Sequence, residues 1–320
     1  MTLKPRDLLT RSGEALELES LTGEVGLDRA LPQPDVASPG LVLAGYTERF
    51  VPSRTHVLGE TEISYLTSLA DEARRTTITT FFSFELPCVV ITKGQSPPEP
   101  MLTVAHERGI PVLRTQLKTA EFYQRIKPIL EEAFAPRITL HGSLADVYGV
   151  GLLFTGRSGI GKSECVLDLV ERGHRLVADD AVIAIRRGSI LIGQGHDLAA
   201  HHMEIRGVGL IDIPALFGIR SVRQQKRIEV VVHLEDWNNA PDPDRTGLIR
   251  QETSVLEVKL PRVVVPLNPG KNLTVISEVV AMNHLRRMTG VDTAAAFNDR
   301  LIRRMREKRG LREYLQEDYE

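Results

Sequence analysis

The octet GRSGIGKS at residues 156–163 constrains this chain more than any other stretch of its sequence. It fits the P-loop pattern G-x-x-x-x-G-K-[S/T], in which glycines let backbone N–H groups curl around phosphate oxygens at a helix N-terminus. The context is also met, because we expect an apolar strand at 148–155 and a helix at 162–172 that ends at Gly173. The octet therefore predicts a phosphate site made of Gly156, Arg157, Ser158, Gly159, Ile160, Gly161, Lys162 and Ser163.

Two of these side chains carry specific chemistry. Lys162 adds a mobile positive charge that can reach the β- and γ-phosphates of ATP, and the Ser163 hydroxyl can ligate Mg²⁺. The alternative is a glycine-rich turn between strand and helix that binds nothing. The full octet in the expected strand and helix context favours the phosphate site.

Length and composition indicate a globular protein of two domains. The chain has 320 residues, of which 42% are apolar and 26% charged, and a formal net charge of −2. That charge favours neither nucleic acid nor an anionic membrane as a partner. We find no signal peptide and no apolar run long enough to span a bilayer, and the two cysteines lie outside any CxxC motif. We therefore expect a cytoplasmic protein.

The N-terminal part predicts a small α/β domain. After a Pro-, Gly- and Ser-rich stretch at 20–60, apolar spacing indicates a helix at 62–75 and a strand at 87–92. A helix ending at Gly109, a strand at 110–114 and a helix at 119–134 follow. Because Pro136 follows the last helix, we place the boundary near 130–138, with domains at 1–132 and 133–320.

The second domain continues with short strands after the P-loop helix. We expect them at 175–178, 182–185, 190–192, 229–234, 254–260 and 263–265. Near the end of the chain, Phe297, Leu301, Ile302 and Met305 have the spacing of one helical face. From these residues alone, a parallel doubly wound sheet is the first expectation.

Asp179 and Asp180 follow the strand predicted at 175–178. Two acids after a strand are by themselves most often a solvated turn. Beside a P-loop, one carboxylate can reach Mg²⁺ while the other faces the phosphoryl acceptor. Adjacent carboxylates also raise one pKa of the pair, which suits an acid/base group.

Other polar residues are less specific when taken singly. His141 could be structural, Glu204, Arg206 and Gly207 could form a salt-bridged turn, and Arg245 lies in a polar loop where arginines are usually solvated. The histidines at 196, 201 and 202 lack the spacing of a metal site.

Three ordered motifs together resemble the HPr kinase/phosphorylase family over nearly the whole chain. HGSLADVYGVGLLFTGRSGIGKSECVLDLVERGHRLVADD is similar to the family's signature stretch, and MEIRGVGLID at 203–212 resembles its second signature. PLNPGKN at 266–272, with the VISEVVAMNHLRRMTG that follows, resembles the third. SPGLVLAGY at 38–46 is similar to part of the family's N-terminal α/β regulatory domain.

The resemblance implies a fold and an activity. The catalytic domain would resemble the nucleotide-binding core of phosphoenolpyruvate carboxykinase, which replaces the doubly wound expectation. The enzyme would use Mg²⁺ and ATP, or pyrophosphate, to phosphorylate a serine of the phosphocarrier protein HPr. It would also reverse the reaction by phosphorolysis, and it would assemble as a homohexamer.

Site residues follow from the resemblance position by position. His141, Lys162, Asp180 and Arg245 match active-site residues, and Ser163 and Glu204 match Mg²⁺ ligands. Residues 203–212, with Arg206 and Gly207, match a segment needed in both directions, and 266–271, with Pro266, Asn268 and Lys271, match one needed for dephosphorylation. Asp179 is expected to support its neighbour Asp180.

Three positions depart from the family's pattern. Arg157 stands where an acid is frequent, and Asn268 and Lys271 stand where arginines are usual. Two other functions stay open at this point: a P-loop kinase for a small metabolite, and a non-enzymatic hexamer that senses ATP. Because sensing needs only a phosphate cradle, the joint presence of Asp180, Arg245 and Glu204 disfavours the sensor.

Overall fold

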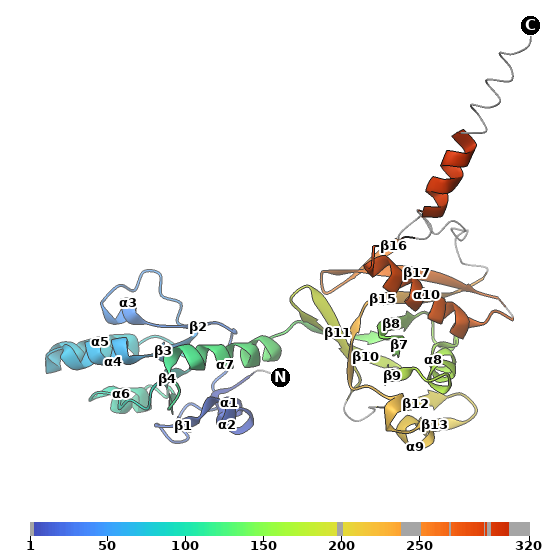
Figure 1. Cartoon of the computed structure of the whole chain (residues 1–320). Helices are drawn as coiled ribbons and strands as arrows, with labels where there is room; N and C mark the ends of the chain where they lie inside the picture. Colours follow the sequence, from blue (N-terminus) through green and yellow to red (C-terminus); the bar gives the residue numbers. More distant parts are fainter. Residues whose placement is uncertain are drawn as a thin grey trace, which may run out of the picture. The chain divides into compact units, whose positions relative to one another are not determined.

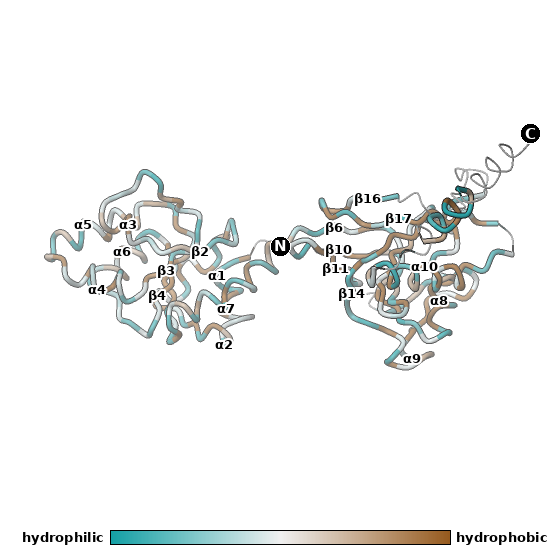
Figure 2. Tube along the Cα trace, turned by 45° about the horizontal axis from the view of Figure 1, so that its top comes forward, coloured by the Kyte–Doolittle hydropathy of each residue, from teal (hydrophilic) through white to brown (hydrophobic). Residues whose placement is uncertain are grey.

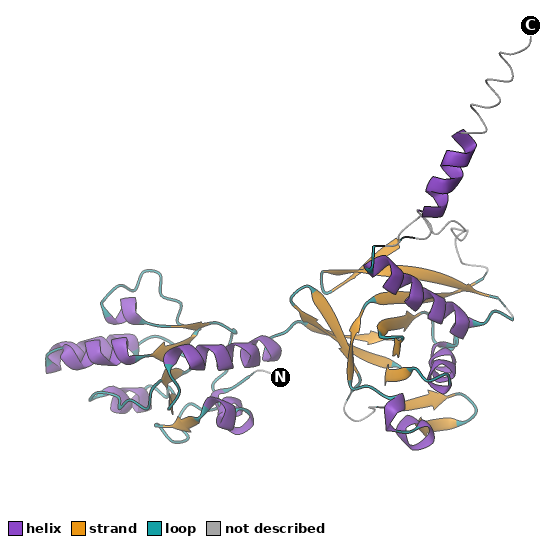
Figure 3. Ribbon diagram, in the orientation of Figure 1, coloured by secondary structure: helices purple, strands orange, loops and turns teal. Residues whose placement is uncertain are grey.

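The computed structural model describes residues 3–196, 201–237, 251–268, 270–290, 292 and 296–306. The chain divides into two compact units, Met1–Ala135 and Pro136–Glu320 (Figure 1). Both units mix helices and strands, as Figure 3 shows, so each is an α/β structure.

The N-terminal unit is built on a five-stranded sheet in the order β1-β5-β4-β3-β2. Its strands are β1 (Leu18–Ser20), β2 (Val36–Ala37), β3 (Thr55–Leu58), β4 (Val89–Ile91) and β5 (Val112–Thr115). β2 to β5 run parallel, and β1 is antiparallel to β5 at one edge. Figure 2 shows the central strands β3 and β4 as hydrophobic, which is typical of parallel strands covered on both faces.

Helices cover both faces of this sheet. They are α1 (Pro5–Arg11), α2 (Gly13–Leu16), α3 (Gly40–Leu43), α4 (Glu60–Ser68), α5 (Asp71–Phe81), α6 (Met101–Glu107) and α7 (Thr119–Ala133). Because side chains alternate along a strand, Leu58 packs with α3 to α6, whereas its neighbour Val57 packs with α1, α2 and α7. The unit is therefore a three-layer α/β/α sandwich.

The single helix expected at 62–75 is wrong. The segment forms α4 and α5, which are separated by an extended backbone at Leu69 and Ala70. Asp71 and Glu72 then occupy the first turn of α5, where carboxylates interact favourably with the positive end of the helix dipole. The apolar spacing of the sequence continues across this break, so the spacing alone did not reveal it.

The C-terminal unit contains a six-stranded sheet in the order β16-β17-β15-β8-β7-β9. Its strands are β7 (Ser143–Val147), β8 (Val150–Thr155), β9 (Arg175–Ala178), β15 (Val230–Asp236), β16 (Gln251–Val255) and β17 (Val258–Leu267). Only β8, β15 and β17 run parallel, and antiparallel strands flank them on both sides. The doubly wound parallel sheet expected from the residues alone is therefore wrong.

Two layers cover this mixed sheet. On one face lie α8 (Lys162–Glu171) and α10 (Leu273–Met288), whose apolar residues pack on Leu152 and Phe154 of β8. On the other face Leu153 packs against the second sheet, of order β14-β11-β10-β6. Its strands are β6 (Arg137–His141), β10 (Ala181–Arg187), β11 (Ile190–Gln194) and β14 (Gln225–Ile228).

A hairpin and short helices complete this unit. They are β12 (His202–Ile205), β13 (Gly209–Asp212), α9 (Ile213–Phe217) and the 3-10 turn Ile219–Ser221. Residues 296–306 are helical, as the apolar spacing predicted. None of the described helices is long and apolar enough to cross a membrane.

Two predicted strands contain turns instead. Tyr148 and Gly149 have φ of 51° and 83° and form the turn between β7 and β8, so the expected strand begins only at Val150. Leu256 and Glu257, at 47° and 63°, divide the segment expected as one strand at 254–260. Positive φ at non-glycine residues is uncommon, and sequence patterns did not indicate it here.

Candidate active site

The P-loop lies between β8 and α8, where the sequence predicted it. Gly156 has φ of 143°, and a Cβ there would lie 2.6 Å from the carbonyl oxygen of Leu234. Gly159 also has a positive φ, of 73°. Only glycine fits these positions without strain, and the resulting loop delivers Lys162 to the first turn of α8.

The ammonium group of Lys162 is held inside the loop. The residue is only 6% exposed, and its Nζ donates to the carbonyl oxygens of Gly156 at 3.2 Å and Arg157 at 3.1 Å. Its third neighbour is Nε2 of His141 at 3.4 Å. An ammonium group that donates hydrogen bonds to the carbonyl oxygens of its own loop can exchange them for phosphate oxygens without leaving the site.

Asp179 faces inward and holds two serines. Its Oδ1 accepts hydrogen bonds from Ser143 Oγ at 2.5 Å and from Ser163 Oγ at 3.0 Å. Burial raises the pKa of this carboxyl group, while the two serine hydrogen bonds oppose the shift. Asp179 therefore orients the hydroxyl of the P-loop serine.

Asp180 faces the opposite way, toward solvent. Its backbone has φ of 63°, and its side chain is 80% exposed. Oδ1 lies 3.2 Å from Nδ1 of His141, whose side chain is 54% exposed. The pairing of β10 with β6 places Ala181 opposite His141 and so fixes this contact. His141 thus lies between Lys162 and Asp180, with one ring nitrogen toward each.

The β12–β13 hairpin brings a second positive charge to the P-loop. A Cβ added to Gly159 would lie 2.5 Å from Nη1 of Arg206, so the guanidinium lies directly against this glycine. Gly207, with φ of 85°, follows in the turn of the hairpin. The hairpin itself is anchored by Met203, which packs into the core beside α8.

A metal ion fits part of this arrangement. Glu204 is exposed on β12, and the Ser163 hydroxyl is oriented by a carboxylate. Within the described part of the chain, no three His, Cys, Asp or Glu side chains converge into a metal site. Mg²⁺ that binds together with substrate phosphates needs only one or two protein oxygens, so the residues present suit that mode.

Arg157 is tied to an acid that the sequence analysis missed. Its guanidinium forms two hydrogen bonds to Asp236, with Nε at 2.6 Å and Nη2 at 2.9 Å. Asp236 ends β15, the strand beside β8. Parallel strands bring their carboxyl ends to the same edge of a sheet. An acid ending the apolar strand predicted at 229–234 could have signalled this position.

The segment after β17 reaches the same edge. Leu267 pairs with Asp236 in the β15–β17 register, so Asn268 follows at the same edge as the Arg157–Asp236 pair. Lys271 donates from Nζ to the carbonyl oxygen of Pro266 at 2.8 Å and from its backbone N–H to that of Asn268 at 3.0 Å. Arg245 lies outside the described residues.

Comparison with known proteins identifies the family. The family model of the HPr serine kinase C-terminal domain matches residues 132–301, and that of the HPr serine kinase N terminus matches residues 6–130. The chain belongs to the HPr serine kinase family.

Two relatives that cover nearly the whole chain agree with this assignment. The HPr kinase/phosphorylase of Geobacter sulfurreducens is 43% identical over 306 residues, which cover 95% of this chain and 96% of the relative. That of Treponema pallidum (strain Nichols) is 40% identical over 320 residues, with 99% and 98% covered. The solved structure of the Hpr(Ser) kinase/phosphatase from Coxiella burnetii is 32% identical and covers 50% of this chain and 98% of its own, with a TM-score of 0.46.

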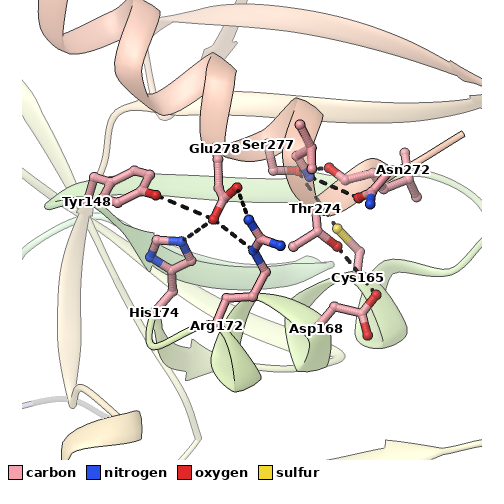
Figure 4. A network of polar contacts seen from close by, with 11 residues as sticks. Tyr148, Cys165, Asp168, Arg172, His174, Asn272, Thr274, Ser277 and Glu278 are labelled. Carbon is pink, nitrogen blue, oxygen red and sulfur yellow. Dashed lines mark hydrogen bonds and ion pairs between the residues drawn. The ribbon is translucent and has the colours of Figure 1, made fainter.

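In this member of the HPr serine kinase family, a polar seam joins α8 to α10 (Figure 4). Glu278 is 8% exposed and accepts two hydrogen bonds from Arg172, at 2.9 and 2.8 Å, and contacts His174 Nε2 at 3.1 Å. Nearer the P-loop, Thr274 Oγ1 donates to Asp168 at 3.3 Å. The seam fixes the P-loop helix against the helix that follows residues 266–272. Sequence patterns did not indicate it.

Proposed function

We propose that this chain transfers a phosphoryl group from ATP, or from pyrophosphate, to a serine of the phosphocarrier protein HPr. We also propose the reverse reaction, in which inorganic phosphate attacks phosphoserine and pyrophosphate leaves. Family membership supports both directions, because the relatives that cover nearly the whole chain are named HPr kinase/phosphorylase.

The observation that carries the proposal is the pair His141–Asp180 beside the P-loop lysine. A serine hydroxyl is a poor nucleophile, so a positioned base is needed to accept its proton during transfer. Asp180 supplies that base, and the 3.2 Å contact with His141 holds its carboxylate in one orientation. His141 in turn contacts Lys162, which connects the base to the phosphate cradle.

In the kinase direction, the serine oxygen bonds to the terminal phosphorus of the donor while its proton passes to Asp180. The bond from that phosphorus to the bridging oxygen breaks, and ADP leaves, or phosphate when pyrophosphate is the donor. In the reverse direction, Asp180 enters protonated and gives that proton to the serine oxygen as its bond to phosphorus breaks. The attacking phosphate oxygen forms the new P–O bond of pyrophosphate. One carboxyl group thus serves both directions.

Charge neutralisation comes from the groups around the loop. Lys162 and Arg206 lie against the P-loop, and we assign Arg245 to the same task from the family pattern. Ser163 and Glu204 would hold Mg²⁺, which supplies further neutralisation of the phosphate charge when bound. Asp179 keeps the Ser163 hydroxyl oriented for this role.

The exposure of the pair favours a protein acceptor over a small metabolite. With Asp180 80% and His141 54% exposed, the base is open to a serine presented on the surface of another protein. Kinases for small metabolites instead commonly enclose their substrate to exclude water.

The assembly and the domains complete the proposal. We propose a homohexamer, a regulatory and assembly role for residues 1–132, and a catalytic domain at 133–320. We also propose that the catalytic core resembles that of phosphoenolpyruvate carboxykinase.

The direct test uses pure protein, HPr and ATP labelled in its γ-phosphate. We expect the label to appear on an HPr serine. After ATP is removed and unlabelled phosphate is added, we expect the label to leave the serine as pyrophosphate. A HPr variant with alanine at the modified serine is the control. Absence of serine label under Mg²⁺ and saturating ATP contradicts the proposal, and release of free phosphate instead of pyrophosphate contradicts its reverse half.

A further inference from the structure

The N-terminal unit contains a cavity that the proposed chemistry does not use. It lies where the chain leaves β2, passes through α3 and returns to β3, and its volume is about 150 Å³. A water molecule needs only about 10–15 Å³ of such space, so a small organic molecule fits. The lining residues include Leu41, Tyr46, Arg49, Phe50, Arg54 and His56.

Two buried polar atoms without hydrogen-bond partners belong to residues that line this cavity, Arg54 Nε and His56 Nδ1. Four other side-chain atoms of the described residues are in the same state, including Oγ1 of the intervening Thr55, which does not line the cavity. Because a buried polar atom without a partner destabilises the protein, two of them in the lining of one cavity point to a ligand that satisfies them.

His56 specifies one feature of that ligand. The residue is 1% exposed, and burial lowers its pKa to about 4, so the ring is neutral at pH 7. Its Nε2 lies 3.2 Å from the carbonyl oxygen of Pro52 and must carry the proton. Nδ1 is therefore an acceptor, and the ligand must offer it a hydroxyl or another donor.

The two arginines specify a second feature. Arg49 forms no ion pair with any residue in the described part of the chain, and the ion pair of Arg54 is the 3.8 Å contact between Nε and Asp35 Oδ2. No acidic side chain lines the cavity. Two guanidinium groups without a close carboxylate suit a carboxylate or a phosphate group.

The rest of the lining is apolar and partly open. Of the large hydrophobic residues that are exposed in the described N-terminal unit, Leu41, Tyr46 and Val51 line the cavity, and only Tyr65 lies elsewhere. Phe50 lies against the His56 ring, at 4.8 Å between centroids. Rings and aliphatic groups around a few polar atoms are typical of small-molecule sites.

We propose that this cavity binds a small organic anion, either a carboxylate or a phosphate ester, that carries a neighbouring hydroxyl group. The anion lies against Arg49 and Arg54, and the hydroxyl donates to His56. The site belongs entirely to the N-terminal unit and is separate from the P-loop, so it gives that unit a ligand-binding role of its own.

The test measures binding to the full chain by isothermal titration calorimetry. Phenyllactate serves as the carboxylate probe with a hydroxyl and a ring, glycerol 3-phosphate as the phosphate probe, and phenylpropionate as the probe that lacks the hydroxyl. We expect at least one of the first two to bind in the micromolar to millimolar range, and the choice between them identifies the anion.

Variants decide where the probe binds. Arg49→Gln and Arg54→Gln should each weaken binding about tenfold or more, because each removes a charged hydrogen-bond donor. Lys162→Met and Arg125→Gln, on the P-loop and on α7, should leave binding unchanged. Arg49 is exposed, so its variant folds even if Arg54→Gln or His56→Phe does not.

Three results overturn the proposal. The first is no measurable heat with either hydroxyl-bearing probe into the millimolar range. The second is binding that Lys162→Met abolishes and Arg49→Gln leaves intact, because the probe then occupies the P-loop. The third is equal affinity for phenyllactate and phenylpropionate, or full phenyllactate affinity in His56→Phe, because the hydroxyl then makes no contribution.

Discussion

Arg157 of the P-loop and Asp236 at the end of β15 form a bidentate ion pair, with hydrogen bonds of 2.6 and 2.9 Å. The arginine holds the pKa of Asp236 below its usual range, and Asp236 raises that of Arg157. The positive charge of Arg157 is therefore compensated by a carboxylate on a neighbouring strand. Asp236 engages guanidinium donors that Arg157 could otherwise offer to phosphate.

Replacing Asp236 by asparagine should leave the Arg157 guanidinium without its charged partner. We expect Asp236→Asn to bind pyrophosphate several-fold more tightly at low ionic strength, because an uncompensated guanidinium then lies beside the phosphate loop. Titration with and without added salt measures the effect. Glu257→Gln, which removes an exposed partner of Arg186 instead, is the control. Unchanged affinity in Asp236→Asn shows that Arg157 does not reach the anion.

Lys162 requires a variant that preserves packing. It is buried and contacts two loop carbonyls, so its aliphatic stem is part of the packed loop. Lys162→Met keeps the stem and removes the charge, and both reaction directions should fall to background. Thermal unfolding should change less than in Lys162→Ala. Turnover near the wild-type rate in Lys162→Met refutes the P-loop assignment.

The two adjacent acids should behave differently. Asp180→Asn should lower kinase turnover by about two to four orders of magnitude with little change in ATP affinity, because it removes the base and leaves the cradle intact. Asp179→Asn should retain far more turnover, since an amide oxygen can still accept from Ser143 and Ser163. If Asp179→Asn loses more turnover than Asp180→Asn in a steady-state assay, then Asp179 is the base and Asp180 is not.

The raised pKa of Asp179 predicts that its contribution to the stability of the protein changes with pH. Its folded pKa is raised by burial, so its contribution to stability is complete below the ordinary value of 3.8 and is lost as pH rises through the folded value. At pH 7 the buried charge costs stability, and Asp179→Asn should unfold at the same or a higher temperature than the wild type. If Asp179→Asn melts at a lower temperature than the wild type at pH 7, the prediction is contradicted.

Lys271 should limit the reverse reaction. Its ammonium bonds to the Pro266 carbonyl and offers a point charge rather than the two-pronged donor of an arginine. Lys271→Arg, or Asn268→Arg, should lower the KM for phosphate in HPr dephosphorylation and leave kinase rates nearly unchanged. Phosphate titrations of wild type and Lys271→Arg measure this. If wild-type dephosphorylation already saturates at low phosphate and Lys271→Arg does not lower the KM for phosphate, then Asn268 and Lys271 do not limit the reverse reaction.

Glu278 should control the stability of the helix pair α8–α10. Hydrogen bonds from Arg172 lower its pKa, so its contribution is present above the ordinary value of 4.5 and is lost as pH falls through the folded value. Glu278→Gln should therefore lower the melting temperature by several degrees at pH 7, and the difference should shrink in acid. Glu171→Gln, an exposed change on α8, is the control. Equal melting temperatures at pH 7 contradict the prediction.

The sequence by itself determined the local elements around the phosphate site. The octet at 156–163 predicted a strand, a loop and a helix because glycines, a lysine and apolar flanks encode that conformation over a few residues. β9 was predicted at its observed bounds for the same reason, since the apolar residues Leu176, Val177 and Ala178 stand between Gly173 and an acidic turn. Three ordered motifs then indicated the family.

Tertiary structure alone decided which side chains meet. Asp179 and Asp180 are neighbours in sequence, yet one is buried against two serines and the other is exposed beside His141. That difference follows from the positive φ of Asp180 and from the pairing of β6 with β10, which join segments about forty residues apart. The Arg157–Asp236 pair likewise depends on β15 lying parallel to β8. Periodicity reports the burial of single segments, whereas contacts between distant segments depend on strand order and register, which no local pattern contains.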